Sequence, residues 1–168
     1  FIFKSIISKK LKDREIKEIC ILKNTEWKFG IKSQLKWFDK NIKKFDIHNL
    51  FYIKSTLVGY TALKKKRFKI KNSSKKNQFL QFDTLVIKKK YRKFKLSRLL
   101  MNFNNLIIIQ SGLPSILICE DRFLDFYKKN SWKLINKKMI NIVGHPFSSN
   151  VMSLSKLNLR KKYTFYFN

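Results

Sequence analysis

Acidic residues are scarce in this chain of 168 residues. It has 10 Asp and Glu against 39 Lys and Arg, which gives a formal net charge of +29. One interpretation is a polyanionic partner such as RNA, or an anionic membrane surface, either of which would attract so basic a protein. The other is a coding bias that favours Lys, Ile, Asn and Phe over Gly (4 residues) and Pro (2 residues) and scatters lysines over solvated faces. Charge alone therefore does not identify the function.

Cysteine and histidine are also scarce, with two residues of each. Cys20 and Cys119 lie far apart in the sequence, and neither has a second Cys or His at metal-ligand spacing. We therefore expect two buried, reduced thiols in a cytoplasmic protein, with no disulfide and no metal site. No apolar run approaches the length of a membrane span, and the apolar core of the first ten residues is too short for a signal peptide.

The content of hydrophobic and aromatic residues indicates one globular domain. Hydrophobic residues make up 44% of the chain and aromatic residues 15%, which is enough for a packed core. We expect this domain to span residues 1–168, with 158–168 as a loose C-terminal tail. The alternative for Tyr163–Phe167 is a further strand.

The spacing of apolar residues predicts strands and helices that alternate along the chain. Strands are expected at 1–8, 49–53, 57–63, 79–87, 115–119, 131–135 and 151–157, and helices at 12–23, 31–44, 96–110 and 120–130. The basic segment 64–78 is expected to form a long, exposed and mobile loop. This order favours an α/β (α+β) fold with a mixed sheet.

The stretch from Phe79 to Gln110 combines a strand, a basic turn and a helix. The β-branched run ends at Ile87, the turn spans Lys88 to Lys95, and the helix carries an apolar stripe from Leu96 onwards. The first amides of a helix have no intrahelical acceptor, and the helix dipole favours an anion there. This turn is therefore suited to bind a phosphate group.

Residues 86–100, VIKKKYRKFKLSRLL, resemble the pyrophosphate segment of the GNAT superfamily of acyl-CoA-dependent N-acyltransferases. In that family a basic residue or Gln after a strand is followed by two variable residues, Gly, one variable residue, Gly or Ala, and an apolar helix. Arg92 falls on the basic position, Lys95 on the first glycine and Ser97 on the second. Lys95 departs from the pattern, because its Cβ occupies space where glycine would let the backbone approach the diphosphate.

Residues 116–132, ILICEDRFLDFYKKNSW, are similar to the next block of the same family. Glu120 stands at the polar position that follows a strand, and Phe126-Tyr127 match an aromatic-Tyr pair on a short helix. The resemblance implies a single domain with a mixed, mostly antiparallel central sheet flanked by helices. It also implies acetyl-CoA as the co-substrate, without a metal.

The resemblance further implies roles for individual residues. A backbone N–H near Val86 or Ile87 would polarise the thioester carbonyl, and Tyr127 would protonate the leaving thiolate. A phenol suits this task because its usual pKa of about 10 keeps it protonated at neutral pH; the alternative is that Tyr127 only packs in the core with Phe123. The residues expected to hold CoA are Val86, Ile87, Arg92, Lys93, Phe94, Lys95, Leu96, Ser97 and Arg98.

The sequence offers several candidates for the general base. Asp83 on the central strand and Glu120 at the end of the next strand are the carboxylates that we expect in the site, with a water relay as the alternative. His48 is expected to contact the acceptor, whereas His145 is expected to be structural. Each candidate also has a structural interpretation: an ion pair for Asp83, a helix-start carboxylate for Glu120 and a hydrogen-bonded loop residue for His48.

Two functions of different classes remain open. The first is an N-acetyltransferase that transfers an acyl group from acetyl-CoA to the primary amine of a small acceptor, such as an amino sugar or a nucleotide-sugar. That acceptor class comes from a loose similarity of segments 34–38 and 46–48 to family members tied to surface-polysaccharide synthesis. The second is a non-catalytic RNA-binding or ribonucleoprotein component on the same scaffold, in which aromatic residues between the lysines of 89–94 stack on bases.

Overall fold

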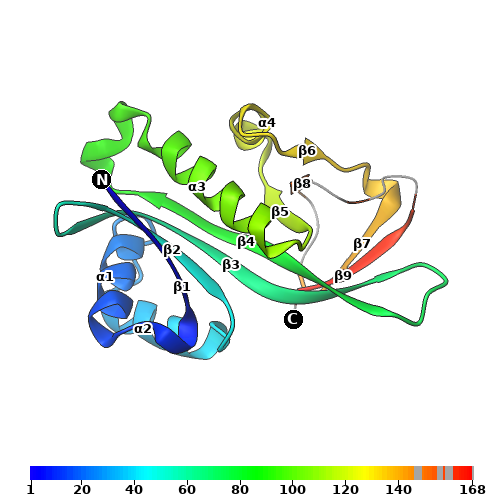
Figure 1. Cartoon of the computed structure of the whole chain (residues 1–168), viewed down its shortest axis with the longest axis horizontal. Coiled ribbons are helices and arrows are strands. Elements are labelled where there is room, and N and C mark those ends of the chain that lie inside the picture. Colours follow the sequence, from blue (N-terminus) through cyan, green and yellow to red (C-terminus); the bar gives the residue numbers. More distant parts are fainter. Residues whose placement is uncertain (146–148, 155–156, 158–160, 168) are drawn as a thin grey trace. The chain divides into compact units, whose positions relative to one another are not determined.

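A computed structural model describes residues 1–145, 149–154, 157 and 161–167 (Figure 1). The helices are α1 (Asp13–Asn24), α2 (Ile31–Asn41), α3 (Leu96–Ser111) and α4 (Leu124–Lys129). The strands are β1 (Ile2–Ile7), β2 (Ile47–Ile53), β3 (Thr56–Ile70), β4 (Lys76–Ile87), β5 (Ser115–Cys119), β6 (Lys133–Leu134), β7 (Ile140–Val143), β8 (Asn150–Leu154) and β9 (Tyr163–Tyr166). Short 3-10 turns lie at Ser8–Lys10, Lys89–Phe94, Asp121–Phe123 and Lys137–Met139.

The chain divides into two compact units. The first unit contains Phe1–Lys64 and Asp83–Asn104, and the second contains Lys65–Phe82 and Asn105–Asn168. Strands β3 and β4 and helix α3 each contribute residues to both units. None of the helices in the described residues is long and apolar enough to cross a membrane.

In the first unit, helices cover both faces of the strands (Figure 1). Strands β1, β2 and β3 are antiparallel neighbours. Successive residues of a strand point to opposite faces, so Val86 and Ile87 enter different cores. Val86 packs with residues of α1 and α2, including Ile19 and Phe38, whereas Ile87 packs in the cluster that contains Leu100 of α3.

Helix α3 lies very close to β3 at Gly59. A Cβ built on Gly59 would stand 2.7 Å from Ile87 Cδ1 and 3.0 Å from Leu100 Cδ2. The cross-strand partner of Gly59 is Phe51, whose ring fills the space that a side chain would otherwise take. Glycine here therefore lets Ile87 and Leu100 pack close to β3, because an added Cβ would force these side chains to shift.

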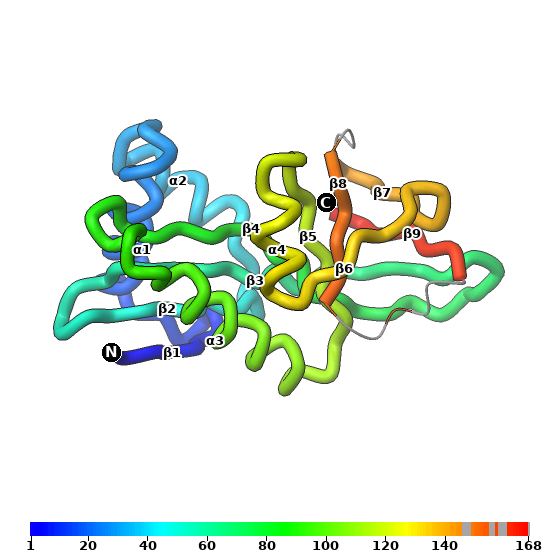
Figure 2. Tube along the Cα trace, turned by 90° about the horizontal axis from the view of Figure 1, so that it is seen from above, coloured from blue at the N-terminus to red at the C-terminus, as the bar shows by residue number. Residues whose placement is uncertain are grey.

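The second unit has its own core and a mixed strand arrangement. Strand β8 lies between β5 and β6 and is antiparallel to both, whereas β5 is parallel to β4 (Figure 2). Strand β9 is antiparallel to β3 and parallel to β7. The core is rich in aromatic rings that contact one another: Phe68, Phe79, Tyr163, Phe165 and Phe167. Antiparallel pairs predominate, so the predicted α/β class with a mixed, mostly antiparallel sheet is confirmed.

The expectation of a long loop at 64–78 is wrong. Strand β3 runs on to Ile70 and β4 begins at Lys76, which leaves only a short turn between them. The basic segment is held in a strand because Phe68 is buried against aromatic rings and because Arg67–Ile70 pair with β9. That partner lies about a hundred residues away in the sequence, so local composition could not reveal it.

The C-terminal segment Tyr163–Tyr166 is a strand, the second of the two alternatives considered for it. Residues 158–160 and 168 of the predicted tail lie outside the described residues, as do 155–156 of the strand predicted at 151–157. The helix predicted at 120–130 is shorter than expected, since Asp121–Phe123 form a 3-10 turn before α4.

The close approach at Gly59 can be tested by filling it. We expect Gly59→Val to lower the free energy of unfolding by about 1–3 kcal/mol, because the added methyl groups displace Ile87 and Leu100. Gly59→Ala is the graded control and should cost less. Urea denaturation measures both variants; a Gly59→Val protein as stable as the parent would contradict this packing.

Candidate functional site

The basic turn after β4 is anchored to the strand end in the first unit. The Arg92 Nε–H donates a hydrogen bond to the Ile87 carbonyl at 3.0 Å, and the Arg92 guanidinium also forms an ion pair with Glu26. The Lys88 N–H donates to the Val58 carbonyl of β3 at 2.8 Å. Arg92 therefore fixes the turn as well as adding charge to it.

Lys95 joins this turn to helix α3 in a left-handed conformation, with φ 54° and ψ 20°. Glycine favours this region because it has no Cβ to clash with the backbone. Lys95 thus adopts a backbone conformation that glycine takes more easily, and its side chain is exposed. The Arg98 N–H bonds to the Lys95 carbonyl at 3.0 Å, so the helix starts directly after this residue. The amides of the first helical turn that precede Arg98, those of Leu96 and Ser97, are the groups that can receive an anion.

The other residues predicted to hold CoA divide into exposed and buried sets. Lys93, Phe94 and Arg98 are exposed, and Ser97 is half-buried. The side chains of Val86, Ile87 and Leu96 are buried in the two cores of the first unit. These three can therefore offer only backbone groups to a ligand.

A cavity of about 630 Å³ opens in the same unit. Helix α1 and the loop after it contribute a lysine and two aromatic residues, α2 contributes polar and aromatic residues, and β4 contributes a carboxylate and a hydroxyl. The lining residues are Lys23, Trp27, Phe29, Ser33, Gln34, Trp37, Asp83 and Thr84. Gln34 fixes the loop by donating from Nε2 to the Trp27 carbonyl at 2.8 Å.

Asp83 is the carboxylate of this cavity and has two defined partners. Lys64 Nζ lies 3.1 Å from Asp83 Oδ1, and the Thr84 hydroxyl donates to Asp83 Oδ2 at 3.0 Å. The structural interpretation of Asp83 as an ion-paired residue is therefore correct. Its place on the cavity wall also keeps it within reach of a ligand.

Two lysines share the indole of Trp37. Lys23 Nζ lies 3.6 Å from the ring centroid and Lys64 Nζ lies 4.6 Å from it, both within the range of cation–π attraction. Burial lowers the pKa of the Lys23 ammonium to about 8, and the Lys64 charge acts in the same direction, whereas Asp83 opposes the shift. At neutral pH Lys23 remains mostly charged.

The sequence prediction did not include Lys23, Trp37 or Lys64. One signal was present: Lys23 continues the stripe of Ile16, Ile19 and Cys20 on α1 at helical spacing, which is an unusual place for a lysine. Lys64 could not be found in this way, because it lies in the segment that local composition assigns to a loop.

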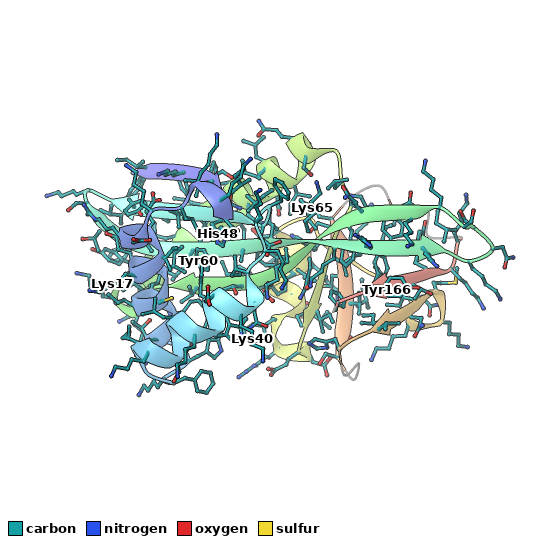
Figure 3. All side chains as sticks on the ribbon, turned by 90° about the horizontal axis from the view of Figure 1, so that it is seen from below. Lys17, Lys40, His48, Tyr60, Lys65 and Tyr166 are labelled. Atoms are coloured by element: carbon teal, nitrogen blue, oxygen red, sulfur yellow. The ribbon has the colours of Figure 1, made fainter. Side chains whose placement is uncertain are left out.

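His48 does not line the cavity. It is fully buried on β2, with Nδ1 2.8 Å from the Tyr60 hydroxyl and Nε2 2.9 Å from the Ser8 hydroxyl (Figure 3). Burial lowers the pKa of the imidazole to about 4, and the charges of Lys23 and Lys64 add to the effect. The expectation that His48 contacts the acceptor is therefore corrected. Both of its ring nitrogens have partners inside the protein and the residue is fully buried, so His48 is a structural residue.

Tyr127 and Glu120 belong to the second unit. The Tyr127 ring packs edge-on against Phe82 and Trp132, with ring centroids 6.1 Å and 6.4 Å away. Burial raises the pKa of its phenol to about 12, so the hydroxyl keeps its proton at neutral pH. Phe123, the packing partner suggested by the sequence, is 43% exposed instead. Glu120 is exposed and forms an ion pair with Arg122, with Nε and Oε2 2.9 Å apart.

The described residues contain no group of three or more His, Cys, Asp or Glu side chains placed to hold a metal ion. Cys20 and Cys119 are both buried and unbridged, as predicted. His145 lies in an exposed part of the chain after β7, and Pro146, which follows it, lies outside the described residues.

The buried His48 predicts a specific dependence of stability on pH. Its pKa is about 4 in the folded chain and 6.5 in the unfolded reference. Below pH 6.5 the unfolded state binds a proton that the folded state does not, so stability is lost as the pH falls towards 4. Between pH 7 and pH 5 this loss amounts to about 2 kcal/mol.

A His48→Gln variant lacks this titration, so its deficit against the parent should shrink by that amount over the same pH range. His145→Gln, a change at an exposed histidine, is the matched control. Urea denaturation at several pH values measures both. A deficit for His48→Gln that does not change with pH would contradict the neutral, buried imidazole.

No family model and no curated protein matches the sequence. The fold of this chain does, however, resemble those of solved structures. YhbS, a GNAT family N-acetyltransferase from Escherichia coli in complex with CoA, gives a TM-score of 0.67 at 14% identity, covering 99% of this chain and 91% of that chain. An acyl-CoA N-acyltransferase from Pseudomonas aeruginosa gives 0.66 at 12% identity, covering 92% and 99%.

An aminoglycoside 6′-N-acetyltransferase complexed with coenzyme A gives a TM-score of 0.65 at 12% identity, covering 91% of this chain and 96% of that chain. These likenesses extend over nearly the full length of each protein. The chain therefore has the fold of the GNAT superfamily of acyl-CoA N-acyltransferases.

Proposed function

We propose that this protein is an N-acyltransferase that transfers an acyl group from acetyl-CoA to the primary amine of a small acceptor. The observation that carries the proposal is the anchored basic turn before α3, in which Lys95 adopts the left-handed conformation that glycine favours. Solved structures of the same fold that contain CoA support this assignment. We further propose that the whole chain acts as one cytoplasmic acyltransferase domain.

The proposed reaction needs a base and an acid. The amine loses a proton and attacks the thioester carbonyl, a C–N bond forms, the C–S bond breaks, and the thiolate takes up a proton. Both carboxylates are ion-paired, Asp83 with Lys64 and Glu120 with Arg122, and Asp83 is the better supported base candidate because it lines the cavity. Tyr127 is the proposed acid for the thiolate, and a backbone N–H near Val86 or Ile87 is the proposed donor to the carbonyl oxygen.

The cavity of the first unit is the proposed acceptor site. Its aromatic and polar lining suits a small organic amine. An amino sugar or a nucleotide-sugar remains the proposed acceptor class, and the aminoglycoside 6′-N-acetyltransferases of the same fold support amine acceptors of this kind. Since Lys23 and Lys64 place positive charge at or beside this cavity, an amino sugar and a nucleotide-sugar should bind with different affinities.

Binding of acetyl-CoA tests the first step. At a concentration of ~100 times its Kd, acetyl-CoA should stabilise the folded protein by roughly 2.7 kcal/mol, because only the folded state binds it. Lys95→Gly and Lys95→Val both remove the same ammonium, but only valine opposes the left-handed conformation. We expect the Gly variant to retain binding and the Val variant to lose at least about 10-fold in affinity, measured by calorimetry.

Equal affinities of the two Lys95 variants would show that the backbone conformation does not shape the site. A protein that acetyl-CoA does not stabilise, but that RNA binds with a steep dependence on salt, would favour the non-catalytic RNA-binding alternative instead. Exposed Phe94 and the lysines around it would then be the stacking and phosphate-binding groups.

Tyr127→Phe tests the proposed acid. Because the pKa of the phenol is about 12, the hydroxyl can donate a proton throughout the neutral range. Its removal should lower kcat by roughly 10- to 100-fold while leaving the Kd for acetyl-CoA unchanged. Tyr166→Phe, a half-buried tyrosine of β9, is the control and should retain full activity. An unchanged kcat for Tyr127→Phe would remove Tyr127 from this role.

A further inference from the structure

Two ammonium groups and one carboxylate lie at or directly beside the cavity of the first unit: Lys23 and Asp83 line it, and Lys64 contacts the lining residues Asp83 and Trp37. Among the described residues that line it, Asp83 is the one carboxylate, and it is already held by Lys64 at 3.1 Å. Lys23 adds a second ammonium, and only 6% of the surface of this residue is exposed. Counting Lys64, which contacts the lining from outside it, two ammonium groups lie near a single carboxylate.

The position of Lys23 makes this excess important for ligand binding. Its ammonium lies over Trp37, which attracts a cation far less strongly than a carboxylate does. Burial lowers the pKa of Lys23 to about 8, and the attraction of Asp83, which is ion-paired with Lys64, opposes this shift only in part. An anionic group that entered the cavity would give Lys23 a direct ion-pair partner.

The rest of the lining suits a ligand with a flat or apolar part. Trp27, Phe29 and Trp37 are 38%, 72% and 36% exposed, so their rings offer surface that a ligand can cover. Ser33, Gln34 and Thr84 add hydroxyl and amide groups for hydrogen bonds. Asp83 is the group that would accept a hydrogen bond from an ammonium.

We propose that the acceptor is a small primary amine that also carries an anionic group, a carboxylate or a phosphate, which binds Lys23 while the amine lies beside Asp83. This rests on the proposed acyltransferase function and narrows its substrate class. Polycationic amines are disfavoured, because Lys23 and Lys64 repel each added positive charge. Of the two sugar classes above, the phosphate-bearing nucleotide-sugar is the one that the cavity favours.

Matched pairs of acceptors test this charge preference. Phenylalanine against phenethylamine isolates a carboxylate, and phosphoethanolamine against ethanolamine isolates a phosphate; spermidine represents the polycations. In at least one pair, we expect the amine that carries the carboxylate or phosphate to have a kcat/KM about 10- to 100-fold higher than the amine that lacks it. A larger ratio of kcat/KM values in the phenylalanine pair identifies a carboxylate as the preferred group, and a larger ratio in the phosphoethanolamine pair identifies a phosphate. Ratios near one in both pairs, or spermidine as the best acceptor, would overturn the proposal.

Three variants assign the preference to Lys23. Lys23→Met keeps the length of the side chain without its charge, and the ratio within the preferred pair should fall to about one. Lys23→Arg should retain the preference. Lys36→Met makes the same change in net charge at an exposed site on α2 and should also retain it. A ratio that survives Lys23→Met would place the anion-binding group elsewhere.

Binding without acyl transfer separates this inference from the proposed function. Trp27 and Trp37 line the cavity, so its occupation should change the tryptophan fluorescence, and Trp37→Phe should reduce that change. If no amine is acylated but phenylalanine still alters the signal in a Lys23-dependent way, the enzyme assignment fails and the anion site stands. If amines are acylated without any preference for the anionic partner, the enzyme assignment stands and the anion site fails.

Discussion

The burial of β4 on both faces is the constraint on which the first unit depends. Val86 must fill the core under α1 and α2, and Ile87 must fill the core under α3, so this strand cannot shift by one residue without exposing both sets. Gly59 allows α3 to pack directly on the neighbouring strand. The end of β4 is thereby fixed, and with it the start of the basic turn that leads into α3.

Much of this arrangement could be predicted from local sequence. The strand at 85–87, the basic turn and the apolar stripe of α3 follow from residue spacing alone, as do α1 and α2. Segment 64–78 could not be predicted, because its strand depends on Phe68 burying against Phe165 and on pairing with β9, both remote in the sequence. Long-range contacts override local propensity at such positions.

The candidate site was predicted in part, and for a similar reason. Asp83 was expected from an acidic residue on an apolar strand, and it does line a cavity. The role of His48 was predicted wrongly, because the sequence does not show that Ser8 and Tyr60 lie within hydrogen-bond distance of its two ring nitrogens. Lys23 and Lys64 were missed because a lysine is normally taken to be solvated, and only the structure shows both ammonium groups over one indole.

The left-handed conformation of Lys95 has a consequence for how such turns are found in sequences. A non-glycine residue in that region costs roughly 1 kcal/mol, which the hydrogen bond from Arg92 to Ile87 and the packing of Leu96 can offset. A lysine can therefore occupy this position without changing the backbone path that its neighbours impose on the turn. A search of sequences for glycine at such a position would overlook a turn of this conformation.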